Sequence, residues 1–120
     1  IMDEKLSWVY MTCGSLDEAR KLGQVLLEKN LAACVNILDG MRSLYRWEGA
    51  VQEDQETVLI AKTRHELMDE LTETVNSNHS YECPCIIELS IDGGNPEFLK
   101  WIVSETKGGS KNRTDQKSQN

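Results

Sequence analysis

The 120-residue sequence lacks several features that would assign it to a protein class directly. No stretch approaches the about 18–20 consecutive apolar residues that cross a bilayer, so we expect no membrane association. No apolar run behind a basic start marks a signal peptide. The motifs G-x-S-x-G and G-x-G-x-x-G and the Walker phosphate loop are also missing, and we therefore expect no catalytic activity.

Positive charge is scarce. Lys and Arg number 13 against 20 Asp and Glu, a net charge of −7, which disfavours binding to phosphate backbones and predicts no nucleic-acid partner. Residues 108–120 contain no apolar side chain, and the last 17 residues carry an excess of basic over acidic groups. We therefore expect one folded domain over residues 1–107 and a disordered polar tail over residues 108–120.

The cysteines form no C-x-x-C pair, which argues against a zinc ribbon or a thioredoxin-type motif. Cys83-Pro84-Cys85 is too short a loop for an unstrained disulfide. One interpretation is that all four cysteines are small buried side chains in a reducing compartment, which predicts a cytoplasmic protein. The four are Cys13, Cys34, Cys83 and Cys85.

Hydrophobic periodicity predicts four strands and three helices. The strands cover residues 7–13, 32–47, 56–63 and 85–91, and the helices cover residues 16–29, 64–77 and 96–108. Capping boxes at Ser15/Glu18 and Thr63/Glu66 begin the first two helices, and Asp39-Gly40 predicts a kink or a bulge in the long hairpin.

This order predicts an α+β fold of the ferredoxin-like, split βαβ type (βαββαβ) with an extra C-terminal helix. Two helices cover only one face of a four-stranded antiparallel sheet, and the strands carry too few polar residues for the other face to be fully exposed to solvent. We therefore expect self-association, with Tyr45 and Trp47 of the hairpin buried at the contact.

The same topology gathers a set of soft and borderline ligands. The end of the first strand, at Cys13, lies beside the start of the fourth, near His79, Cys83 and Cys85. Thiolate and imidazole suit copper or zinc rather than magnesium or calcium. The alternative is that the cysteines are packed core residues and that His79 is a loop or capping histidine.

A second group combines aromatic and charged residues. It is either an ordinary belt at the strand ends or an interface or ligand cleft, where Trp, Tyr and Arg concentrate. The cleft candidates are Tyr45, Trp47, Lys62, Tyr81 and Trp101.

Several segments together resemble the CutA divalent-cation-tolerance family. They are LAACVNI from Leu31, SLYRWEG from Ser43, VQEDQE from Val51, KT at Lys62, HSYECP from His79 and GNPEFLKW from Gly94. The resemblance covers residues 7–103 and implies a ferredoxin-like homotrimer linked to tolerance of copper and other divalent metals, with no metal needed for folding.

The resemblance also implies site residues. Cys13 matches a cysteine implicated in copper binding in bacterial members, and His79 matches the second of two adjacent histidines, the first of which is Asn78 here. Cys85 stands where the family usually has a glutamate, so the site gains thiols and loses a carboxylate.

Two functions from different classes follow. The first is a copper-binding homotrimer of the metal response. The second is a trimeric signalling module resembling the PII regulators, which bind small ligands in clefts between subunits. A protein-anchoring role, associated with a cholinesterase-linked branch of the family, is a minor alternative, and an acylphosphatase-like hydrolase is disfavoured because its phosphate loop is absent.

Overall fold

Strands and helices follow one another in the order that the periodicity predicts. The structure is a computed structural model, and it describes residues 4–109. The elements are β1 (Leu6–Cys13), α1 (Leu16–Glu28), β2 (Cys34–Trp47), β3 (Ala50–Arg64), the 3₁₀ turn η1 (His65–Leu67), α2 (Met68–Asn78), β4 (Ile86–Ile91) and α3 (Pro96–Ser104).

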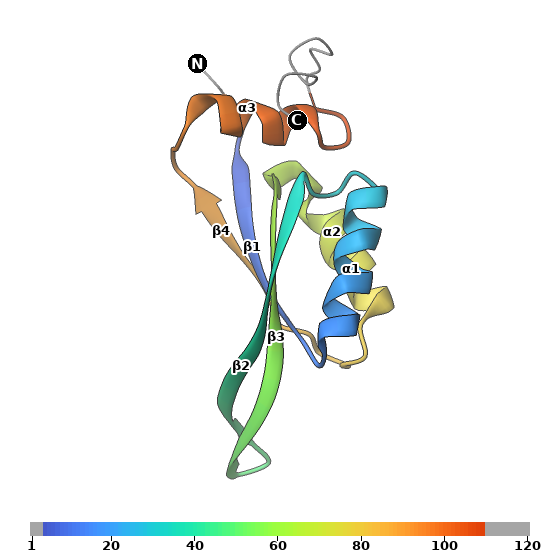
Figure 1. The fold of residues 1–120 in the computed structure, drawn as a ribbon, viewed down its shortest axis with the longest axis vertical. Helices are drawn as coiled ribbons and strands as arrows, with labels where there is room; N and C mark the ends of the chain where they lie inside the picture. Colours follow the sequence, from blue (N-terminus) through green and yellow to red (C-terminus); the bar gives the residue numbers. More distant parts are fainter. Residues whose placement is uncertain (1–3, 110–120) are drawn as a thin grey trace.

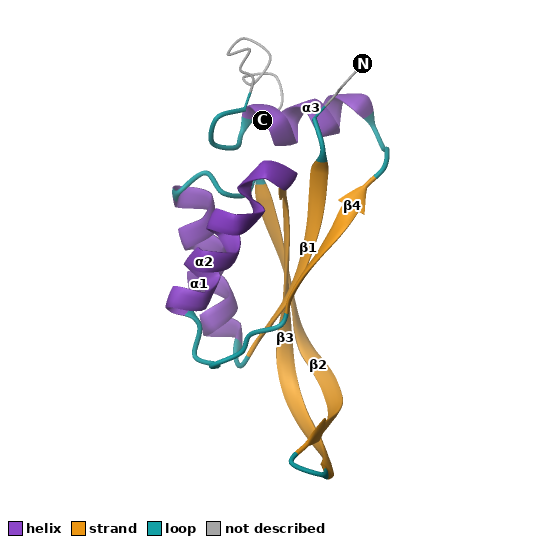
Figure 2. Ribbon diagram, turned by 180° about the vertical axis from the view of Figure 1, so that it is seen from behind, coloured by secondary structure: helices purple, strands orange, loops and turns teal. Residues whose placement is uncertain are grey.

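The four strands form one antiparallel sheet in the order β2-β3-β1-β4. Helices α1 and α2 lie together on one face of this sheet, and α3 lies across the end where β1 begins and β4 ends (Figures 1 and 2). This is the ferredoxin-like arrangement, so the predicted α+β fold with an extra C-terminal helix is confirmed.

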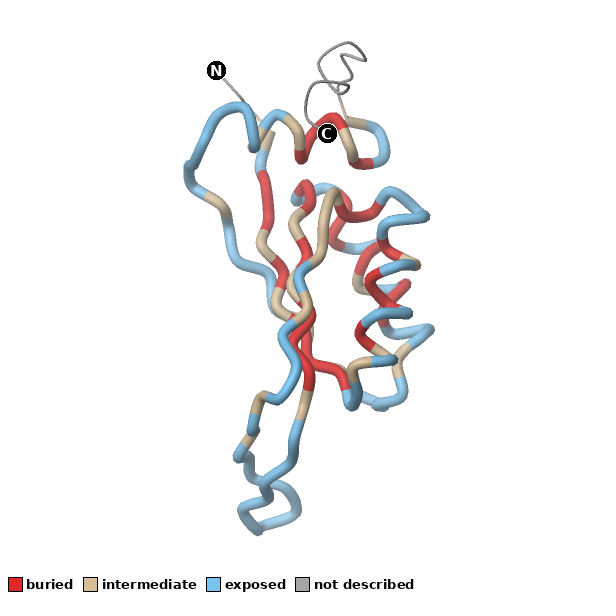
Figure 3. The backbone as a smooth tube through the Cα atoms, in the orientation of Figure 1, coloured by how far each residue is buried: buried red, intermediate tan, exposed pale blue. Residues whose placement is uncertain are grey.

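The core fills the space between the sheet and the two helices. On α1, Ala19, Leu22, Gly23 and Leu26 are buried at helical spacing and face the inward side chains of β1 and β3. Burial of each leucine contributes about 1.5–3 kcal/mol. A Cβ atom on Gly23 would stand 3.0 Å from Val35, so this glycine permits the close approach of α1 to the sheet. Buried segments concentrate in this layer (Figure 3).

A second, smaller cluster lies under α3, where Leu6, Ile102 and Val103 are buried. Beside it, the Arg64 side chain is 1% exposed and ties three parts of the chain together. Its Nε donates to Thr106 Oγ1 at 3.0 Å, its Nη1 pairs with Glu66 at 2.9 Å and Glu4 at 3.3 Å, and its Nη2 donates to the Lys107 carbonyl. The chain after α3 is therefore fastened to the end of β3.

The β2–β3 hairpin projects well beyond the helices (Figure 1), along the 53 Å long axis of the molecule. The predicted bulge at Asp39-Gly40 is confirmed, because the strand register shifts between Leu38 and Met41 and Gly40 has a φ of 80°. No residue from Gly40 to Glu56 is buried within the chain. The outer half of the hairpin therefore has no core of its own.

Two local predictions about the helices differ from the structure. Thr63 does not cap the second helix: it continues β3, is fully buried and donates to the Leu31 carbonyl at 2.6 Å. Pairing of β3 with β1 extends to Arg64 opposite Leu6, and a 3₁₀ turn then precedes α2 at Met68. The third helix ends at Ser104 rather than Gly108. The predicted polar tail lies outside the described residues beyond Gly109.

Candidate metal centre

Cys13 occupies the last position of β1, opposite Thr57 of β3. It follows Val9 and Met11 on the inward face of the strand and is fully buried among the core residues. Burial, and to a smaller extent the nearby negative charges of Glu18 and Glu56, together raise the pKa of the Cys13 thiol to about 12. The free thiol is therefore protonated at neutral pH, and a metal ion would have to displace its proton.

His79 ends α2, where its backbone is extended, and its side chain is fully buried. Its Nε2 lies 2.8 Å from the Thr12 carbonyl, and its Nδ1 lies 3.0 Å from the Tyr81 backbone nitrogen. A carbonyl only accepts and a backbone N–H only donates, so Nε2 carries the proton and Nδ1 carries the lone pair. The imidazole is therefore neutral, and both of its nitrogens are engaged.

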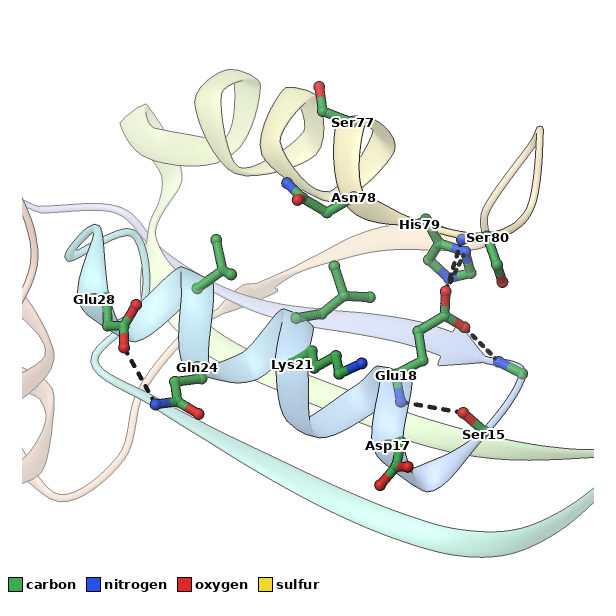
Figure 4. A pocket seen from close by; sticks show the side chains of 13 residues that line it. Ser15, Asp17, Glu18, Lys21, Gln24, Glu28, Ser77, Asn78, His79 and Ser80 are labelled. Atoms are coloured by element: carbon green, nitrogen blue, oxygen red, sulfur yellow. Dashed lines mark hydrogen bonds and ion pairs between the residues drawn. The ribbon is translucent and has the colours of Figure 1, made fainter.

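Glu18 joins the two segments that flank the site. Its carboxylate accepts the Gly14 N–H at 2.9 Å and the Ser80 N–H at 2.7 Å, and it lies 3.6 Å from His79 Nδ1 (Figure 4). Partial burial raises the pKa of Glu18, but its interactions with Gly14, Ser80 and His79 together outweigh burial and hold that pKa below its usual value. The carboxylate is therefore ionised in the resting site.

The structure brings together a thiol, a carboxylate and an imidazole. One donor atom from each of Cys13, Glu18 and His79 lies within 4.8 Å of the other two. Metal–ligand bonds of about 2.0–2.3 Å place tetrahedral ligands about 3.3–3.8 Å apart. The separation of 3.6 Å between His79 Nδ1 and the Glu18 carboxylate already falls in this range. A sulfur, nitrogen and oxygen set of this kind fits copper or zinc.

The sequence did not indicate Glu18 as a site residue. Its spacing from Ser15 predicts a capping box, and the Ser15 side chain does accept the Glu18 N–H at 3.1 Å. Within residues 4–109, the Glu18 carboxylate does not accept the Ser15 N–H, which is the second bond of a capping box. It accepts the N–H groups of Gly14 and Ser80 instead. The sequence did offer one signal for a third ligand, because an acidic residue, Glu18, follows soon after the cysteine that ends β1.

Cys83 and Cys85 lie outside this three-residue group. Cys83 is exposed and Cys85 is half-buried. The Cys85 thiol interacts with the side chain of Thr12, which precedes Cys13 on β1 and so points to the opposite face of the sheet. Burial raises the pKa of Cys85. Neither thiol is among the donor atoms that lie within 4.8 Å of one another in the described structure.

The cleft candidates are dispersed over the single chain. Tyr45 and Trp47 lie on the exposed part of the hairpin, and Tyr81 lies in the loop beside the metal centre. Lys62 lies on the sheet face away from the helices, where its ammonium contacts Asn36 and Cys34. Trp101 packs in the cluster under α3, and its Nε1 is buried without a hydrogen-bond partner in the described residues.

Comparison with known proteins identifies the family. The family model described as CutA1 divalent ion tolerance protein matches residues 7–105, which is most of the chain. The chain belongs to the CutA1 family. A solved structure of CutA1 from Oryza sativa has a TM-score of 0.86 and 43% identity, covering 88% of this chain and 96% of that one.

Two named relatives show how widely the CutA1 family extends. Protein CutA, chloroplastic, from Arabidopsis thaliana is 46% identical over 99 residues, which cover 82% of this chain and 54% of that protein. The divalent-cation tolerance protein CutA of Pyrococcus horikoshii is 40% identical, with 82% of this chain and 96% of that protein covered. The chain thus spans about half the length of the plant relative and nearly all of the archaeal one.

Relatives in the CutA1 family carry different compartment names. The Arabidopsis protein is called chloroplastic, and a structure from Archaeoglobus fulgidus, 41% identical with a TM-score of 0.82, is titled periplasmic. Among residues 4–109, no helix has the length and apolar character needed to cross a membrane. The predicted cytoplasmic location therefore stays a prediction.

Proposed function

We propose that this chain binds copper at a centre built on Cys13, Glu18 and His79, and that it acts without catalysis in the cytoplasmic response to metal ions. The observation that carries the proposal is the convergence of the three donor atoms within 4.8 Å from β1, α1 and the end of α2. Membership of a divalent-cation-tolerance family supports a role with metal ions. No metal is required for folding, because a continuous apolar core supports the same elements.

The donor set favours Cu(I) over harder ions. Thiolate sulfur is a soft ligand, and a neutral imidazole completes a set that suits copper, while other divalent ions such as zinc compete for the same atoms. Binding replaces the Cys13 proton, so it releases protons and weakens as the pH falls. The carboxylate of Glu18 contributes a negative charge that partly neutralises the bound cation.

Competition titration with a Cu(I) chelator tests the assignment. We expect Cys13→Ser and His79→Ala each to lower Cu(I) affinity at least about 100-fold, since even partners outside the ligand shell are worth 10–100-fold. The chain offers matched controls, Cys34→Ser and His65→Ala, which change the same residue types elsewhere and should bind as the wild type does. Wild-type affinity in both site variants would refute the assignment.

The two loop thiols need a separate variant. We expect the double substitution Cys83→Ser with Cys85→Ser to retain most of the Cu(I) affinity, because neither thiol belongs to the group formed by Cys13, Glu18 and His79. If only this double variant loses binding, the chain binds copper through the loop and the family-based assignment of Cys13 and His79 fails.

We also propose that the chain is a homotrimer. The sheet face away from the helices carries Leu38, Ile87 and Leu89, which are 58%, 51% and 48% exposed in the single chain. Aromatic side chains of Trp8 and Tyr10 stack on the same face at 6.4 Å. An apolar sheet face of this kind is expected to be covered, and a second and third copy of the chain supply the covering surface.

The alternative of a small-ligand cleft has weaker support. Its cleft candidates do not converge within one chain, and the one cationic candidate, Lys62, is already engaged with Asn36. A nucleotide site would therefore have to be completed by a neighbouring copy. Separate titrations with ATP and with copper, followed by tryptophan fluorescence, distinguish the two functions.

A further inference from the structure

The loop after α2 is bonded to two of the three proposed ligands. The Tyr81 N–H donates to His79 Nδ1 at 3.0 Å, and the Ser80 N–H donates to Glu18 at 2.7 Å. Figure 4 shows Ser80 and His79 together above the Glu18 carboxylate. The resting loop thus uses the one available lone pair of His79 and holds one oxygen of the Glu18 carboxylate.

Ligation by either nitrogen of His79 breaks the bond to Tyr81. An imidazole nitrogen has one lone pair in the ring plane, so Nδ1 cannot bind a metal and accept the Tyr81 N–H together. If Nε2 binds the metal instead, the proton of the neutral ring moves to Nδ1. Nδ1 is then an N–H donor that faces the Tyr81 N–H, and two donors cannot form a hydrogen bond. Both modes therefore remove the acceptor from the Tyr81 amide.

The side chain of Tyr81 holds the same loop closed. Its hydroxyl donates to Glu56 of β3 at 2.8 Å, and its ring centroid lies 4.7 Å from that of His79. The hydroxyl would also contact a Cβ atom on Gly14 at 3.4 Å, so the ring lies over the residue that follows Cys13. Tyr81 is thus anchored to β3, with its ring beside both His79 and Gly14.

From this geometry we propose that Ser80 and Tyr81 form a latch that competes with metal for the centre. The inference rests on the proposed function and adds its regulation: metal enters only when the latch opens, and occupancy by metal keeps the latch open. The apparent affinity is then the intrinsic affinity multiplied by the open fraction. A chain with a weaker latch should bind metal more tightly.

Tyr81→Phe tests the latch without removing a ligand. It deletes the hydrogen bond to Glu56, which at the net strength of a typical hydrogen bond should raise Cu(I) affinity roughly 3- to 10-fold. Tyr45→Phe is the matched control, because it deletes the same kind of tyrosine–carboxylate bond, to Asp54, on the hairpin. The control should bind as the wild type does.

Wild-type or weaker binding by Tyr81→Phe would overturn the latch. If Cys13→Ser and His79→Ala lose affinity while Tyr81→Phe is unchanged, the metal centre stands and the latch alone fails. If those two ligand variants bind normally, the proposed function fails and the latch with it.

A second measurement uses the wild-type chain alone. Hydrogen exchange at the Ser80 and Tyr81 amides should accelerate when Cu(I) or Zn²⁺ is added, while the neighbouring β1 amides stay protected. Zn²⁺ serves as a probe that undergoes no redox chemistry. Unchanged or slower exchange at both loop amides with bound metal would contradict the latch.

Discussion

At the scale of single residues, the three candidate ligands cannot bind a metal ion until it displaces the proton of the thiol and the hydrogen bonds of the other two side chains. The Cys13 thiol is buried and protonated, His79 is neutral with both nitrogens bonded, and Glu18 is held by two backbone N–H groups. We expect such a centre to discriminate against hard ions, because calcium and magnesium gain too little from sulfur and nitrogen donors to offset these bonds.

The Cys13 thiol predicts a loss of stability in alkali. Its pKa is about 12 in the folded chain against an ordinary value of 9.0, so the unfolded chain loses its proton first as the pH rises. The free energy of unfolding should therefore decrease from about pH 9 upward, through the pKa of the folded state. Chemical denaturation at several pH values measures this dependence.

The variant Cys13→Ser should show a shallower decrease than the wild type, and Cys34→Ser should show the same slope as the wild type. The raised pKa values of Tyr81 and Tyr45 act in the same direction in all three proteins. Equal slopes in wild type and Cys13→Ser would show that this thiol does not carry the effect.

At this scale the sequence predicted some partners and missed others. The topology correctly placed Cys13 near His79, because neighbouring antiparallel strands bring the end of one beside the start of the other. Glu18 was missed because a side chain in the first helical turn reaches either its own cap or a neighbouring loop, and spacing alone does not decide which. The tautomer of His79 depends on Thr12 and Tyr81, which only the folded backbone brings to the ring.

At the scale of elements, Arg64 joins the end of β3 to the chain after α3. We expect Arg64→Ala to lower the free energy of unfolding by about 3 kcal/mol, because a buried guanidinium with several polar partners is lost. The matched control is Arg42→Ala: this arginine pairs with Glu53 at 3.1 Å, but both side chains are largely exposed. That pair should contribute less than about 1 kcal/mol.

Urea denaturation of both variants measures the difference. A loss for Arg64→Ala no larger than that for Arg42→Ala would show that the junction after α3 is not stabilised by this side chain. The position of α3 was predictable from Asn95 and Pro96, and Asn95 does accept the Glu97 N–H at 3.2 Å. The contacts of Arg64 with the chain after α3 were not predictable, because nothing in the sequence indicates that a lone arginine before a helix is buried.

At the scale of the whole molecule, light scattering tests the proposed trimer. We expect a mass of three chains for the wild type at micromolar concentration. Leu89→Lys introduces a charge on the sheet face proposed as the interface and should dissociate the assembly. Leu27→Lys is the matched control, since Leu27 is a comparably exposed leucine on α1 and its substitution should leave the mass unchanged.

A monomeric wild type would refute the trimer, and dissociation by both variants would point to a different surface. The fold itself was predictable, because alternating periods of strands and helices in this order leave few right-handed arrangements. For assembly, the sequence predicts only that one face of the sheet needs covering, because the strands carry few polar residues, and the trimer stays a proposal. Which faces meet depends on the twist and curvature of the sheet, which periodicity does not encode.

In the proposed trimer, we expect the projecting hairpin (Gly40 to Glu56) to influence which chains can assemble with one another. Because no residue from Gly40 to Glu56 is buried within its own chain, substitutions there cost the single subunit little stability. The sequence of the hairpin is therefore expected to be constrained mainly by contacts with neighbouring copies and only weakly by the stability of its own subunit. We therefore expect two related chains expressed in one cell to keep the same core yet form separate assemblies once their hairpins differ.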